Sequence, residues 1–252
     1  MVRSSSGGGV VIWELSEREI DDEMFIESIE PIDERRLLVG VCCEPPEGRQ
    51  RIVDLETATP ELLPVDSRFP HVAPGGTTLV SGGFDVRIEA LGALLAYESG
   101  VGVVVPGPIL REGDGTFLYR PVALTAERVV FIDGESGPIV ISDPSGDVSH
   151  TIELEGAVSV DFDAMNDTVV VLVNDQGASG AAGNTIQFLS ADALSPVAQW
   201  SLEEPVTSID VKDGWLLLSD SDGSLRARTL DDVDAPAVSL IDDTTSAASW
   251  LR

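Results

Sequence analysis

The chain consists of apolar segments of about four to eight residues separated by short polar turns. One pattern recurs five times: an apolar segment, a short turn, a second and more strongly apolar segment, and then two further apolar segments. Such segments, rich in Val, Ile and Leu and bounded by Gly, Asp, Pro and Ser, are typical of β-strands and hairpins. The pattern predicts five repeats of four antiparallel strands, at residues 24–66, 67–116, 117–155, 156–203 and 204–242.

The boundaries inside three of these repeats are specific predictions. In the second repeat we expect a fourth strand at Ala93–Tyr97, followed by an inserted loop at Glu98–Thr116. The fourth repeat should end with a strand at Val197–Leu202, and the fifth should begin with a separate strand at Val206–Val211. The mean spacing of about 43 residues per repeat matches the roughly 40–45 residues of a four-stranded propeller blade.

The sequence therefore predicts an all-β protein: a β-propeller of about five four-stranded blades that forms a single domain over residues 1–252. A pair of β-sandwiches is the competing arrangement. Residues 1–23 and 243–252 lie outside the five repeats. We expect Val10–Leu15 and Ser246–Arg252 to act as closing strands, with a sixth, incomplete blade as the alternative.

Two segments carry a resemblance to a known class of repeat. Phe69–Ser81 reads FPHVAPGGTTLVS, and Pro31–Val39 reads PIDERRLLV. Both resemble the W-S-P-D-G-K-x-I-A-F phrase of TolB-type propeller repeats, which belong with WD40-like repeats among the β-propeller proteins. The resemblance extends over roughly residues 24–241. It implies a propeller that serves mainly as a binding platform, and it implies no catalytic residue.

The charge of the chain narrows the choice of partners. There are 44 Asp and Glu residues against 15 Lys and Arg, which gives a net charge of −29, and Lys212 is the single lysine. So much like charge destabilises a compact state in dilute buffer, whereas at molar salt the Debye length falls to about 3 Å and the repulsion is screened. The composition resembles that of haloarchaeal proteins; an ordinary acidic mesophilic protein is the alternative.

The same charge disfavours two classes of partner. Binding to a phosphate backbone or to an anionic membrane surface requires clustered Lys and Arg, and the sequence contains no such cluster. We therefore expect no nucleic-acid binding and no membrane insertion. The start of the chain lacks the apolar stretch of an export signal, so we expect a cytoplasmic protein, or alternatively a virion component.

Candidate catalytic and metal-binding motifs are weak. Gly134–Pro138 (GESGP) resembles the phrase around the nucleophile of trypsin-like proteases, but its position between two expected strands favours a hairpin turn. His71 and His150 belong to different repeats, which favours structural roles over metal binding. Asp220–Gly223 and Glu112–Gly115 have the alternating oxygen ligands of calcium loops but lack the distal Glu. We expect no catalytic residue, no metal ligand and no cofactor.

Tryptophans are the remaining candidates for a binding surface. Trp200 and Trp215 lie within expected strands, so we predict that both pack in the core. Trp13 and Trp250 lie in the two terminal segments, where we expect them to anchor ring closure rather than form a binding surface.

These observations favour a protein that is not an enzyme and that presents one face to a protein partner or to further copies of itself. Connecting loops carry most binding residues, so the contact residues are expected in the inserted loop at Glu98, Arg111, Glu112 and Asp114. One alternative is a structural subunit of a haloarchaeal virion or cell-surface assembly. A second alternative is an enzyme that acts on glycans at the propeller mouth.

Overall fold

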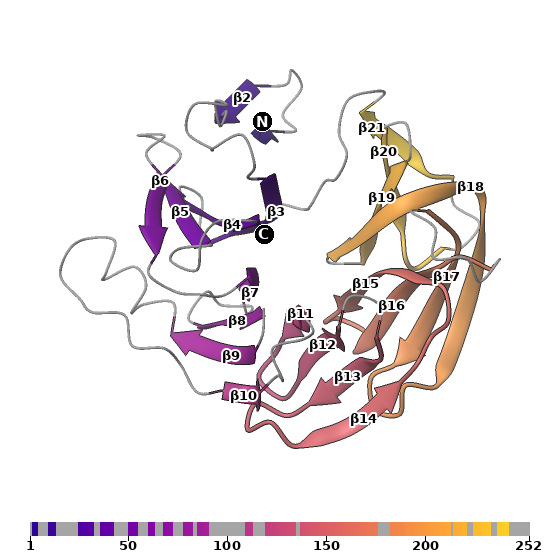
Figure 1. Ribbon diagram of the computed structural model, residues 1–252. Coiled ribbons are helices and arrows are strands. Elements are labelled where there is room, and N and C mark those ends of the chain that lie inside the picture. The colour runs from indigo at the N-terminus through magenta and orange to yellow at the C-terminus, as the bar shows by residue number, and fades with distance from the viewer. Residues whose placement is uncertain are drawn as a thin grey trace. The chain divides into compact units, whose positions relative to one another are not determined.

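The computed structural model consists of β-strands and the turns between them (Figure 1). It describes residues 2–4, 10–13, 25–32, 36–42, 50–54, 60–63, 68–72, 78–82, 85–90, 109–112, 119–134, 137–175, 182–212, 214–220, 224–232 and 236–241. No residue in these ranges belongs to a helix long and apolar enough to cross a membrane.

The chain divides into two compact units, Met1–Leu124 and Thr125–Arg252. The expectation of a single domain over residues 1–252 stays a prediction.

The strands before residue 119 form three antiparallel sheets. A two-stranded sheet pairs β1 (Val2–Ser4) with β2 (Val10–Trp13). A four-stranded sheet follows chain order through β3 (Phe25–Pro31), β4 (Arg36–Cys42), β5 (Gln50–Asp54) and β6 (Pro60–Leu63). The next has β7 (Arg68–Val72), β8 (Thr78–Gly82), β9 (Asp85–Ala90) and β10 (Ile109–Glu112).

The remaining strands form two sheets, again in chain order. The first comprises β11 (Tyr119–Leu124), β12 (Val129–Asp133), β13 (Ile139–Ser142) and β14 (Val148–Ile152). The second has seven strands: β15 (Ala157–Asp163), β16 (Thr168–Val173), β17 (Gly183–Ser190), β18 (Pro196–Lys212), β19 (Trp215–Asp220), β20 (Leu225–Thr229) and β21 (Val238–Ile241). All-β meanders of this kind confirm the predicted fold class.

The seven-stranded sheet contains two of the predicted repeats joined by one strand. We predicted separate strands at Val197–Leu202 and Val206–Val211, but β18 runs unbroken from Pro196 to Lys212. Its first part pairs with β17 and its second part with β19, and Val206 takes part in both ladders. The prediction of a break was wrong because Pro205, which cannot donate a backbone hydrogen bond, lies where the strand changes partner, so no ladder bond is lost there.

The fourth strand of the second repeat also differs from the prediction. We expected it at Ala93–Tyr97, which lies outside the described residues. The strand that pairs with the free side of β9, opposite β8, is β10, at Ile109–Glu112. Both segments belong to one long apolar stretch, and apolarity alone does not reveal which part pairs. The part of the predicted insertion that is described is therefore an edge strand rather than a loop.

A hydrophobic core lies in the last two repeats of the C-terminal unit. Its members are buried apolar side chains from β16, β17, β18 and β19: Val170, Leu172, Ile186, Phe188, Trp200, Val206, Ile209, Val211, Leu216 and Leu218. The ring of Trp200 packs against Phe188 with centroids 4.6 Å apart, and the Arg228 guanidinium lies 5.0 Å from the Trp200 ring centroid. The prediction that Trp200 is a core residue is confirmed.

The predicted closing strands are described in part. Val10–Trp13 forms β2, which pairs with β1. Ser246–Arg252 and Trp250 lie outside the described residues, so closure of the ring by these segments stays a prediction.

Candidate functional site

The predicted contact residues lie in the N-terminal unit. Arg111 and Glu112 are neighbours on the edge strand β10, opposite Val86 and Asp85 of β9, and the Glu112 side chain is exposed. Glu98 and Asp114 lie outside the described residues. Arg111 and Glu112 therefore share one strand, while a contact surface that includes all four residues stays a prediction.

Two other candidate motifs have structural roles: one forms part of a turn, and the other forms hydrogen bonds within its own repeat. Gly134, Gly137 and Pro138 lie between the paired strands β12 and β13, where a hairpin turn was predicted. The Asp133 N–H donates to the Pro138 carbonyl at 2.9 Å, and Gly134 has a φ of 93°, which glycine adopts without strain. The Asp220 carboxylate accepts hydrogen bonds from Arg226 Nε at 2.8 Å and Nη2 at 2.6 Å and from Ser224 Oγ at 2.8 Å. Both carboxylate oxygens of Asp220 therefore accept hydrogen bonds from the Arg226 and Ser224 side chains, whereas a calcium site would need these oxygens as metal ligands.

The two histidines lie on strands of different sheets. His71 lies on β7 and His150 on β14, where the His150 Nδ1 atom is buried without a hydrogen-bond partner. Within the described part of the chain, no group of three or more His, Cys, Asp or Glu side chains is placed to hold a metal ion.

One end of the C-terminal unit gathers several turns, and we call it the hairpin end. The first strands of its last two repeats run parallel, since Ile209 N–H bonds to Ser159 Oγ and Val211 N–H bonds to Asp161 Oδ2. The turns that follow these strands therefore lie at the same end. Further backbone bonds join Ala191 to Asp167 at 3.0 Å and Leu230 to Gly214 at 2.8 Å. The hairpin end comprises residues 125–128, 164–167, 191–195, 214–215 and 230–232.

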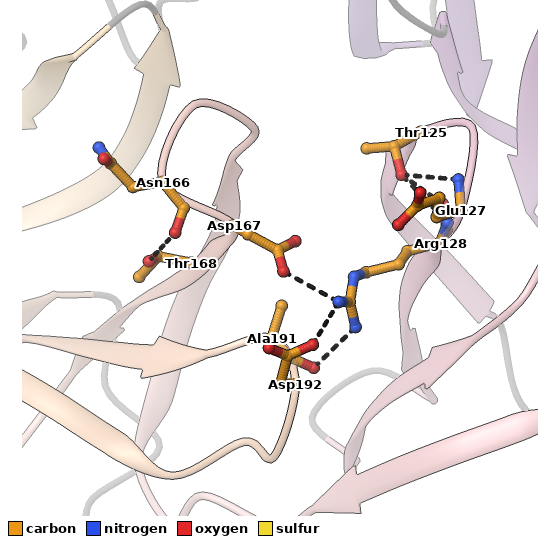
Figure 2. A network of polar contacts seen from close by, with 8 residues as sticks. All are labelled: Thr125, Glu127, Arg128, Asn166, Asp167, Thr168, Ala191 and Asp192. Atoms are coloured by element: carbon orange, nitrogen blue, oxygen red, sulfur yellow. Dashed lines mark hydrogen bonds and ion pairs between the residues drawn. The ribbon is translucent and has the colours of Figure 1, made fainter.

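Arg128 joins three of these turns (Figure 2). Its guanidinium donates through Nη1 to the Ala191 carbonyl at 3.2 Å and through Nη2 to Asp192 Oδ1 at 2.5 Å, and the same Nη2 lies 2.9 Å from Asp167 Oδ2. The hydrogen bond with Asp192 raises the pKa of Arg128 further above its ordinary value, so the cation is permanent. The turn that carries Arg128 is itself stabilised because Thr125 Oγ1 accepts from the Arg128 N–H at 3.0 Å.

The turn that contains Asp167 has its own internal supports. The Asp163 carboxylate accepts from the Met165 N–H at 3.0 Å and from Asn166 Nδ2 at 2.7 Å, and Asp163 is buried at 3% exposure. Thr168 Oγ1 donates to the Asn166 carbonyl at 3.0 Å (Figure 2). These bonds leave the Met165 side chain pointing away from the core, at 69% exposure.

Trp215 is the second large apolar side chain exposed at the hairpin end, at 42% exposure. It was predicted to lie in the core, and that prediction was wrong: Trp215 is the first residue of β19 and lies directly after the turn at Gly214, whereas burial begins at Leu216. In the fourth repeat Asp163 pairs with Thr168 across the turn that contains Met165, and in the fifth repeat Lys212 pairs with Trp215. Both side chains thus lie at the first hairpin of their repeats, Met165 within the turn and Trp215 on the first paired residue after it.

Charge at the hairpin end is strongly negative. Exposed acidic side chains lie on its turns at Glu127, Asp192, Asp231 and Asp232. Arg128 is the cation that the Asp167 and Asp192 carboxylates approach. This surface was not predicted from the sequence, although Met165 follows Asp163 and Ala164 in a polar turn, which is an unusual place for a large apolar residue.

Loss of the Arg128 side chain should remove the hydrogen bonds and ion pairs that connect the turns. Arg128→Ala removes three contacts and leaves the Ala191 carbonyl without its donor, so we expect it to lower the free energy of unfolding by about 1–2 kcal/mol at molar KCl. Urea unfolding measures the change. Arg128→Lys keeps the charge but cannot contact all three partners at once, so its free energy of unfolding should lie between those of the parent protein and Arg128→Ala. An Arg128→Ala variant as stable as the parent protein would show that the network contributes nothing to stability.

Comparison with known proteins identifies the fold of this chain but assigns it to no family. No protein-family model matches the sequence, and no curated protein matches it. Among solved structures, the computationally designed Ika8 protein matches with a TM-score of 0.50 and 13% identity over 83% of this chain and 59% of that chain. A structure of the mitotic checkpoint complex matches with a TM-score of 0.57 and 15% identity over 89% of this chain and 65% of that chain.

The chain spans less than two thirds of the length of either structure. At such low identity the likeness concerns the fold alone. Both matched structures are β-propellers, and the repeats described above are four-stranded antiparallel meanders like theirs. The fold of this chain is that of a β-propeller.

Proposed function

We propose that this chain is a non-catalytic β-propeller scaffold of a salt-adapted, haloarchaeal organism, and that its hairpin end binds a protein partner. The observation that carries the proposal is the pair of exposed side chains Met165 and Trp215 at the first hairpins of neighbouring repeats. Met and aromatic residues are enriched in the buried centres of protein interfaces.

The rigidity of the surrounding turns supports the same proposal. The turn with Met165 is held by Asp163 from within and by Arg128 from outside. The turn before Trp215 is held by the bond between Leu230 and Gly214. A surface that is ordered before binding loses less conformational entropy on association, so more of the contact energy remains as affinity.

Site-specific photo-crosslinking tests the proposal. A benzophenone amino acid placed at position 165 or 215 should crosslink one and the same protein in an extract of the source organism at molar KCl. Position 148 provides a matched control, because Val148 is similarly exposed, at 47%, but lies on strand β14 and not on the hairpin end. Equal crosslinking at all three positions would contradict a specific surface.

Reconstitution with the purified partner gives the quantitative test. Trp215→Ala and Met165→Ala should each raise the dissociation constant on the order of 10- to 30-fold, as truncation of interface anchors does, while Val148→Ala should not change it. Unchanged affinity in all variants would overturn the proposal. Crosslinks to a second copy of this chain would favour the structural-subunit hypothesis instead, and turnover of a glycan substrate would favour an enzyme.

A further inference from the structure

Two arginines lie on strand β20, and their guanidinium groups have different environments. Arg226 donates to both carboxylate oxygens of Asp220. Arg228 forms no ion pair with a carboxylate of the described residues, and its guanidinium lies 5.0 Å from the centroid of the Trp200 ring. The chain has 44 acidic against 15 basic side chains, so a shortage of carboxylates does not explain why Arg228 is unpaired.

Arg228 lies where the fourth and fifth repeats meet. Trp200 belongs to the first part of β18, which pairs with β17 of the fourth repeat, whereas β20 belongs to the fifth. The residue opposite Arg228 on β19 is Leu216, a member of the same core as Trp200. Directly opposite residues of antiparallel strands share one face of the sheet, so Arg228 lies on the face that packs against the fourth repeat.

One donor of this guanidinium is cut off from water. The Nε atom of Arg228 is buried and has no hydrogen-bond partner in the described part of the chain. The face of Trp200 attracts the cation but is a weak hydrogen-bond acceptor, so the ring does not replace an anion. Arg228 as a whole is half-buried, and Nε is its one buried atom without a partner, which leaves the Nη end open to a small ion. A partly desolvated cation of this kind is stabilised by a counter-charge.

The carboxylates beside this contact are occupied by Arg226. Besides its two hydrogen bonds to Asp220, Arg226 approaches Glu204 of β18 with 3.8 Å between Nη1 and Oε2. An anion at Arg228 is therefore not opposed by an unpaired charge on either residue. The net charge of −29 repels anions in dilute buffer, but at 1 M salt the Debye length is about 3 Å, so the site can fill.

We propose that Arg228, stacked on Trp200 between the last two repeats, binds a small monovalent anion, which in KCl is chloride. The anion accepts hydrogen bonds from the Nη atoms and supplies the counter-charge that the described residues do not. It thereby stabilises the contact between a cation of the fifth repeat and a ring of the fourth. The site does not depend on the proposed partner binding, since it concerns the packing of the repeats.

Urea unfolding in two potassium halides at equal concentration tests the proposal. Fluoride holds its water more tightly than chloride and should bind the guanidinium more weakly. With a chloride dissociation constant of a few tenths molar, replacing 2 M fluoride by chloride should raise the folding constant of the parent protein about 5- to 10-fold more than that of Arg228→Gln. Arg128→Gln is the matched control: it loses the same charge but keeps the site, so it should show the full parental difference.

Chloride NMR gives a readout that does not depend on stability. Chloride titrated into the folded parent protein in KF should show saturable line broadening that bromide reverses and that is lost on unfolding in urea. Arg228→Gln should lack this broadening and Arg128→Gln should keep it. If Arg228→Gln does not fold, the anomalous signal of bromide in crystals of the parent protein takes its place, with a peak expected beside the Nη atoms of Arg228.

Three results would overturn the proposal. They are equal chloride effects on the folding constants of the parent protein and Arg228→Gln, unchanged line broadening in Arg228→Gln, and the absence of bromide from Arg228 in the crystals. Each of them would show that water rather than an anion solvates this guanidinium.

Discussion

Lowering the KCl concentration from molar to millimolar is expected to unfold this protein. The net charge of −29 is spread over 252 residues. At 1 M salt the Debye length is about 3 Å, and at 0.01 M it is about 30 Å, so that charges across the whole domain then repel one another. Circular dichroism should show the loss of β structure as KCl is removed, and refolding when it is restored.

Two controls show whether screening is the cause. A non-ionic osmolyte such as sucrose does not screen charge and should restore less structure than KCl. Replacing the exposed carboxylates Glu153, Glu155 and Glu203 by Gln should move the midpoint to lower KCl. A melting temperature that is indifferent to KCl would show that the adaptation to salt inferred from composition is wrong.

Truncation of Trp200 should have the largest effect of any single substitution considered in this protein. Trp200 is 8% exposed, and its ring contacts Phe188 and the Arg228 guanidinium. Trp200→Ala removes these contacts and leaves a cavity between β17, β18 and β20, so we expect the free energy of unfolding to fall by about 3–5 kcal/mol. Urea titration at molar KCl is the suitable measurement, because guanidinium chloride would itself screen the charges.

Trp215→Ala is the matched control for this substitution. It removes the same side chain from a position that is 42% exposed, so the cost in stability should stay near or below 1 kcal/mol. Similar losses in the two variants would show that the burial of Trp200 does not govern its contribution. The two variants also distinguish folding from binding, because we expect Trp200→Ala to reduce stability and Trp215→Ala to reduce the affinity for the partner.

Local pattern was sufficient to place most strands. Phe25–Pro31, Ile139–Ser142 and Leu225–Thr229 have the bounds that alternation and turn residues predict. These strands are short and are flanked by turn-forming residues, so that each hairpin is specified by adjacent sequence.

Features that depend on distant residues could not be predicted in this way. The continuity of β18 depends on which strands flank Pro205, and the choice of β10 depends on what pairs with β9. Arg128 reaches partners 63 and 64 positions away, and Asp161 bonds to a backbone group 50 positions away. No local pattern reveals such contacts, so the hairpin end emerged only from the structure.

The unbroken strand β18 has a consequence for how this protein responds to force. A pull on the chain ends acts on the two repeats through one polypeptide segment of 17 residues that takes part in both ladders. Tension that shears the β17–β18 ladder therefore reaches the β18–β19 ladder without an intervening slack loop. In an optical trap, residues 157–241 should extend in one rupture event rather than in two steps of one repeat each.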